Sequence, residues 1–127
     1  MKRLVFALLC FLCLESPVLA QFARGQIWTT EKGSTLVITA VTPGGFRGTF
    51  TNKSADFFPC SVPSPATATA SFAITMSVNF TKCRATAVWR GDTDRVMAIT
   101  APWTLTYVDQ TGKPQTKYGF DVFFRTR

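Results

Sequence analysis

Residues 72–80 read FAITMSVNF, and this stretch decides the class of fold. Every second residue is large and apolar: Phe72, Ile74, Met76, Val78 and Phe80. The residues between them are small or polar: Ala73, Thr75, Ser77 and Asn79. Strict alternation predicts a β-strand with one face buried and the other in water.

The β-rich pattern repeats on both sides of this stretch. We expect strands at 26–30, 34–41, 45–52, 66–70, 71–80, 84–91, 96–108 and 117–125. Turn residues separate them at 31–33, 42–45, 92–94 and 109–114, and a proline-containing connection covers 61–65. About eight consecutive strands joined by short turns predict an all-β protein, either an up-and-down antiparallel barrel or a sandwich.

Composition narrows the possible functions. The chain has 127 residues, of which 46% are apolar and 17% charged, which is typical of one ordered domain. It contains no His, which excludes a His-based triad and a His-ligated metal, and we expect no metal site. Asp92 and Asp94 are assigned to a turn and Asp121 has no acidic companion in the sequence, so we predict a protein that is not an enzyme.

The positive charge is scattered along the chain. Lys and Arg number 14 against 7 Asp and Glu, without a basic run of three. This distribution favours a solvated basic surface over a nucleic-acid site. Because aromatic residues are interleaved with the charges, an oligonucleotide-binding barrel remains an alternative.

The first twenty residues have the organisation of a signal peptide. Lys2 and Arg3 precede an apolar run at 4–14, and small residues at 18–20 provide a cleavage site. We predict a signal peptide at 1–20 and a mature domain at 21–127, secreted or periplasmic, with no membrane association after cleavage. The alternative is an N-terminal membrane anchor, against which the break at 15–17 argues.

Two cysteines, Cys60 and Cys83, remain in the mature chain. They form no CxxC motif and have no histidine partner, so in an exported protein they predict a disulfide rather than a redox or metal site.

Polar residues fall on several apolar strand faces. Thr30 shares a face with Trp28, Ser34 with Leu36, Asn52 with Phe50, and Asp121 with Phe123. Buried polar groups cost free energy unless they find partners. Two explanations fit this pattern: the polar residues pair with one another in the core, or they form a polar ligand site.

The ordered motifs resemble the avidin and streptavidin family of biotin-binding proteins. They are GQIW at 25–28, GST at 33–35, GTF at 48–50, AVWRG at 87–91, WTL at 103–105 and GFDVF at 119–123. The resemblance covers the mature chain and implies an eight-stranded up-and-down antiparallel β-barrel. The cysteine pair, and the absence of tryptophan between Leu105 and Asp121, resemble the short dimeric bacterial members, which implies a homodimer.

The resemblance also implies a ligand and its contacts. Biotin would be a non-covalently bound ligand and no cofactor is implied. Ser34 would face its ureido oxygen, with Asp121 and Asn52 near the ureido nitrogens. The apolar box would consist of Trp89, Trp103 and Leu105.

Five positions depart from the family pattern, and each implies a weaker contact. Thr30 replaces an amide donor and Phe50 a tyrosine hydroxyl, whereas Ala87, Ala85 and Met76 replace a threonine, a serine and an aromatic wall residue. Each lost donor costs about 1 to 3 kcal/mol where its partner stays buried. We therefore expect weaker binding than in typical family members.

The alternative function is an exported β-barrel interaction or inhibitor protein that has lost biotin binding. In that case Phe57 and Phe58 would form an exposed loop patch, whereas in a biotin-binding protein they could cover the pocket.

Overall fold

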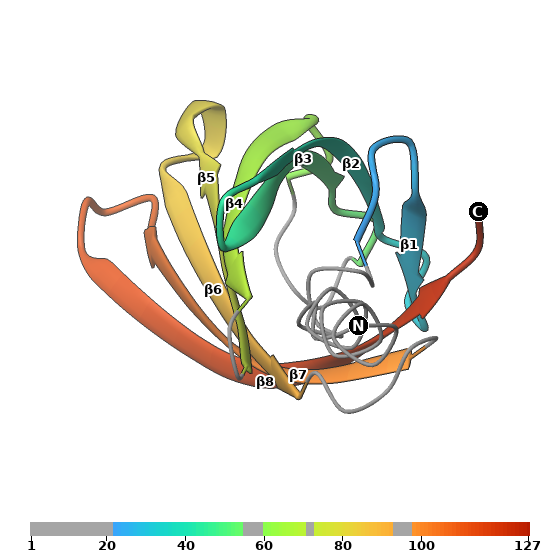
Figure 1. Ribbon diagram of the computed structural model, residues 1–127. Helices are drawn as coiled ribbons and strands as arrows, with labels where there is room; N and C mark the ends of the chain where they lie inside the picture. Colours follow the sequence, from blue (N-terminus) through green and yellow to red (C-terminus); the bar gives the residue numbers. More distant parts are fainter. Residues whose placement is uncertain (1–21, 55–59, 71–72, 93–97) are drawn as a thin grey trace, which may run out of the picture.

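The computed structural model describes residues 22–54, 60–70, 73–92 and 98–127, which form a closed eight-stranded β-barrel (Figure 1). The strands are β1 (Ile27–Thr30), β2 (Thr35–Thr42), β3 (Gly45–Thr51), β4 (Ser64–Ala70), β5 (Ala73–Phe80), β6 (Ala85–Asp92), β7 (Ala98–Val108) and β8 (Pro114–Arg125). Each pairs antiparallel with the next, and β8 closes the barrel on β1. This confirms the predicted all-β, up-and-down fold and shows that it is a barrel and not a sandwich.

Several predicted strand boundaries were wrong. β4 begins at Ser64 and contains Pro65, although both were predicted to lie in a connection. Proline is tolerated there because it lies near the strand start with its ring exposed. β8 begins at Pro114 rather than Lys117, since the hairpin with β7 continues to the Val108–Pro114 pair. Asp92 is the last residue of β6 and not part of a turn.

Small residues on the inward face of β4 leave room for the large side chains of the neighbouring strands. The inward residues of β4 are Ser64, Ala66, Ala68 and Ala70, and they alternate with exposed residues. Ala68 pairs with Phe46 on β3 and Met76 on β5, so a small side chain lies between two large ones. Alternating small and large residues fill a narrow barrel without overpacking.

One end of the barrel is sealed by apolar side chains. Phe22 packs on Trp28 and Phe46, with ring centroids 5.6 and 4.7 Å away. Together with Ile74 and Ile99 they line an apolar cavity of about 20 Å³. Trp28 is therefore part of the core packing.

The opposite end, here called the mouth, carries the connections β1–β2, β3–β4, β5–β6 and β7–β8. The Cys60–Cys83 disulfide lies there, with Cα atoms 6.2 Å apart, and confirms the predicted pair. It joins the β3–β4 connection to a 3-10 helix, η2 (Thr81–Cys83), between β5 and β6.

Some sequence predictions concern residues outside the described ranges. They are the signal peptide at 1–20, the loop phenylalanines Phe57 and Phe58, and the first residue of the opening stretch, Phe72. In the part of the chain that the structure describes, no helix is long and apolar enough to cross a membrane.

Candidate ligand-binding site

A buried polar cluster lies inside the barrel at the mouth. It consists of Thr30 at the end of β1, Ser34 just before β2 and Asn52 just after β3. The Ser34 backbone N–H donates to Thr30 Oγ1 over 3.1 Å, and the Ser34 hydroxyl donates to Asn52 Oδ1 over 3.3 Å. The strand pairs β1–β2 and β2–β3 thus bring together three polar residues predicted from the sequence.

Backbone groups hold this cluster in place. Ser34 Oγ accepts from the Lys53 N–H at 2.9 Å, while Asn52 Oδ1 accepts from the Ser54 N–H at 3.0 Å. Asn52 Nδ2 in turn donates to the Ser54 carbonyl. Asn52 therefore shapes the chain that leaves β3 while its amide remains next to Ser34.

Asp121 is a buried carboxylate on the inward face of β8. Its Oδ2 accepts from Trp89 Nε1 at 2.9 Å, and because β7 separates β6 from β8, this hydrogen bond crosses the inner face of β7. Its Oδ1 lies 3.3 Å from Lys32 Nζ. An indole N–H and an ammonium thus offset the cost of burying the charge.

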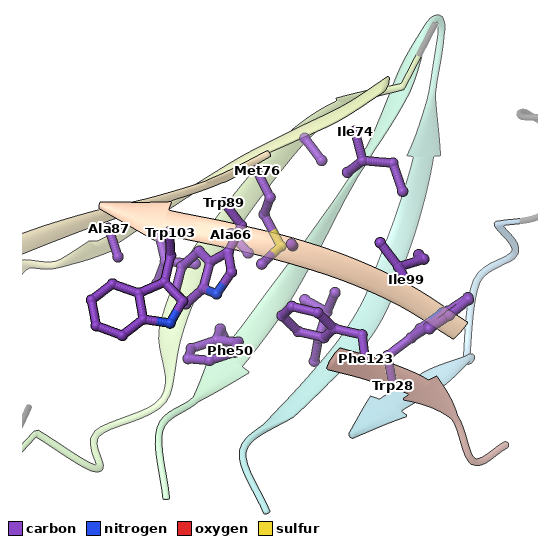
Figure 2. Close-up of a cluster of buried hydrophobic side chains, with 14 of the residues drawn as sticks. Trp28, Phe50, Ala66, Ile74, Met76, Ala87, Trp89, Ile99, Trp103 and Phe123 are labelled. Atoms are coloured by element: carbon purple, nitrogen blue, oxygen red, sulfur yellow. The ribbon is translucent and has the colours of Figure 1, made fainter. Parts of the chain in front are cut away.

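Aromatic side chains gather in the barrel interior (Figure 2). Trp89 pairs with Trp103 across β6 and β7, and their side chains lie next to each other in Figure 2. The Phe50 ring lies 4.9 Å from Trp89 and 6.5 Å from Phe123. Rings from β3, β6, β7 and β8 therefore form an apolar wall beside Asp121.

Trp103 lies so close to Gly119 of β8 that no larger residue fits there. A Cβ atom at Gly119 would lie 2.3 Å from Trp103 Cζ2, far closer than the 3.4–4 Å of ordinary van der Waals contact. Gly119 thereby lets the indole pack directly against the β8 backbone, two residues before Asp121.

The remaining predicted site residues lie at different depths. Leu105 and Ala87 pair across β6 and β7, next to the tryptophan pair and nearer the mouth. Met76 lies deeper and lines the apolar cavity at the sealed end together with Trp89. All ten residues predicted to contact the ligand are buried, and Met76 lines the cavity at the sealed end rather than the mouth.

Two residues at this site were not predicted from the sequence. Lys32 and Glu31 belong to the β1–β2 turn, between Thr30 and Ser34, and both reach β8. Their position between two predicted site residues was the available signal. Within the described residues, no group of three or more His, Cys, Asp or Glu side chains could hold a metal ion.

Comparison with known proteins gives a consistent family assignment. The sequence matches the avidin family over residues 20–126. The structure is similar to the bradavidin2–biotin complex, with a TM-score of 0.76 and 34% identity over 84% of this chain and 100% of that chain. It is also similar to core-bradavidin, with a TM-score of 0.67 and 31% identity over 80% of this chain and 98% of that chain.

The rhizavidin–biotin complex shares the fold, with a TM-score of 0.68 and 24% identity over 84% of this chain and 97% of that chain. No curated protein sequence matches the chain. Avidin-family proteins bind biotin as a ligand, need no cofactor and are not enzymes. The family match and the similarity to bradavidin2 and core-bradavidin together show that this chain belongs to the avidin family.

Proposed function

We propose that this protein is exported and binds biotin, or a ligand with the same ureido group, non-covalently in the mouth of the barrel. The observation that carries the proposal is the buried Asp121 carboxylate, which lies against Trp89 and is enclosed by aromatic rings. A carboxylate in such surroundings is an acceptor for a ligand N–H.

The other end of the ureido group would meet the polar cluster. Ser34 Oγ is buried and already within hydrogen-bond distance of Asn52, so a ligand oxygen would take over the hydroxyl proton that Asn52 now accepts. Exchange of one acceptor for another costs little, since the hydroxyl rotates without moving the backbone.

The affinity is expected to lie below that of typical family members. Thr30 uses its side-chain oxygen as an acceptor for the Ser34 N–H, and Phe50 has no donor at all. Ala85 and Ala87 likewise present methyl groups to the interior. Donors altered or lost at these four positions, at about 1 to 3 kcal/mol each, reduce binding by orders of magnitude.

Export is proposed on two grounds. Residues 1–20 have the charge and apolar pattern of a signal peptide, and the domain contains a disulfide, which persists in oxidising compartments. We further propose a homodimer, for which the exposed aromatic side chains on the outer face of β8 provide an interface.

Calorimetry on the oxidised chain 21–127 tests the ligand assignment. We expect biotin to bind with measurable heat and Ser34→Ala to weaken binding by about tenfold. Ser77→Ala is the matched control, because it removes the same hydroxyl from the exposed face of β5 and should leave the affinity unchanged. If the folded protein binds neither biotin nor desthiobiotin, it is instead an exported barrel that has lost this ligand.

A further inference from the structure

The β1–β2 turn is anchored to β8 at two consecutive residues. Glu31 Oε2 accepts from the Val122 backbone N–H at 2.7 Å, and Lys32 Nζ lies 3.3 Å from Asp121 Oδ1. β1 has only four residues, and its pairing with β8 stops at Phe123. The Glu31 side chain therefore continues the β1–β8 junction and fixes the direction in which Lys32 extends.

Lys32 places a cation between two groups of the proposed ligand site. Its Nζ atom contacts Asp121 and also lies 5.8 Å from the centroid of the Trp103 ring. A carboxylate together with an aromatic face is a favourable environment for an ammonium group. This part of the site is thus already occupied by a group from the chain itself.

We propose that Lys32 is a specificity-determining residue that competes with the ligand for Asp121. The inference rests on the proposed function, in which a ligand N–H donates to this carboxylate. Oδ2 already accepts from Trp89, and Oδ1 is engaged by Lys32. A neutral ligand that donates to Oδ1 must displace the ammonium or share an oxygen whose charge is already compensated.

Burial explains why this competition matters. The Asp121 side chain is 6% exposed, so little water solvates the carboxylate and its charge depends on partners from the chain or from a ligand. The Lys32 side chain is 34% exposed, so water can solvate the ammonium when a ligand displaces it. The ion pair is therefore strong enough to lower affinity and still open to exchange.

The test compares Lys32→Met with the wild type, with biotin methyl ester as the probe. This probe is neutral, so the net positive charge of the protein does not attract it. Calorimetry should show binding about tenfold tighter in Lys32→Met, the size expected for one charge-assisted hydrogen bond. Lys82→Met is the matched control: it removes an exposed lysine of η2, also at the mouth, and should leave the affinity unchanged.

The outcomes separate this inference from the proposed function. If the wild type binds the ester and Lys32→Met binds it equally or more weakly, Lys32 is not a competitor, while the proposed function stands. If the folded wild type, Lys82→Met and Lys32→Met all fail to bind, the proposed function fails and the role of Lys32 fails with it.

A salt series on the wild type provides a second test that needs no variant. Raising NaCl from about 0.02 to about 0.5 M shortens the Debye length and weakens the partly exposed ion pair. We expect the affinity for the ester to rise by about threefold, because a weaker ion pair makes Lys32 easier to displace from Asp121. A flat or falling affinity would contradict the proposal even if Lys32→Met does not fold.

Discussion

At the scale of single residues, Phe50 shows how this site differs from one rich in donors. Its ring is buried against Trp89, at 4.9 Å, and Phe80, at 6.1 Å. A phenyl ring here stabilises the empty barrel, since it leaves no polar group unpaired. Compared with the tyrosine of the family pattern, Phe50 also lacks the hydroxyl donor on the side of the site next to the polar cluster.

We expect Phe50→Tyr combined with Thr30→Asn to tighten biotin binding by about tenfold or more, because both changes restore donors near the Ser34 hydroxyl. The amide oxygen of Asn can still accept from the Ser34 N–H, so the hydrogen bond that Thr30 makes need not be lost. The melting temperature without ligand should fall, since the new hydroxyl is buried without a ligand to pair with it. Calorimetry on the single and double variants measures the gain, and unchanged affinity in a folded protein would indicate a different ligand.

The sequence identified the inward-facing residues of the site but not all of their partners. Thr30, Ser34 and Asp121 could be found because a strand alternates with a period of two, which fixes the face of each side chain. Lys32 could not, because it lies in a turn and its long side chain takes its direction from β8. That contact exists only once the barrel has closed.

At the scale of elements, the strands were predictable and their ends were not. Alternating residues indicated β5 and β7, but the start of β8 depends on how far its register with β7 extends. The β7–β8 turn itself is organised by Asp109. Its Oδ1 accepts from the Thr111 hydroxyl at 2.6 Å and from the N–H groups of Thr111 and Lys113.

These hydrogen bonds lower the pKa of Asp109 from 3.8 to about 2, and the one from the Thr111 hydroxyl has the largest effect. A carboxyl group whose pKa is lower in the folded state stabilises the fold above its unfolded pKa, and this contribution is lost as the pH falls through the folded value. We therefore expect thermal unfolding to show a loss of stability between about pH 4 and pH 2 that is smaller in Asp109→Asn. Thr111→Val should reduce the same loss, whereas a pH-independent difference between the variants and wild type would contradict this role.

The disulfide stabilises the connections at the mouth. Cys60 and Cys83 are 23 residues apart, and closing a loop of this size contributes roughly 3 kcal/mol by restricting the unfolded chain. We expect reduction, or the double change Cys60→Ala and Cys83→Ala, to lower the melting temperature by roughly 10 °C or more. Thermal melting in oxidising and reducing buffer measures this change, and two free thiols on titration of the purified protein would contradict the pairing.

At the scale of the whole molecule, closure of the barrel was the feature that sequence could not decide. Alternation describes a barrel and a sandwich equally well, since both bury one face of each strand. What separates them here is the pairing of β1 with β8, such as Thr30 with Phe123, at opposite ends of the described domain. Local patterns contain no information about a contact over that distance; the family resemblance supplied it instead.

The outer face of the closed barrel carries an aromatic stripe that a solitary barrel would leave in water. On β8, Tyr118, Phe120 and Phe124 are 77%, 61% and 46% exposed, and Pro102 of β7 pairs with Phe120. Contiguous apolar patches of this kind mark interfaces more often than bare surface. Because a two-fold dimer buries the same patch on both subunits, one substitution there acts twice.

We therefore expect Phe120→Glu to convert the proposed homodimer into a monomer, as measured by sedimentation equilibrium on the oxidised chain. Each glutamate would be desolvated in the interface and would face an apolar partner surface, at a cost of several kcal/mol per dimer. Val41→Glu is the matched control, because Val41 is similarly apolar and 45% exposed but lies on β2, away from the stripe. Retention of the dimer in Phe120→Glu, with its loss in Val41→Glu, would place the interface on β2 instead, and a monomeric wild type would exclude the dimer altogether.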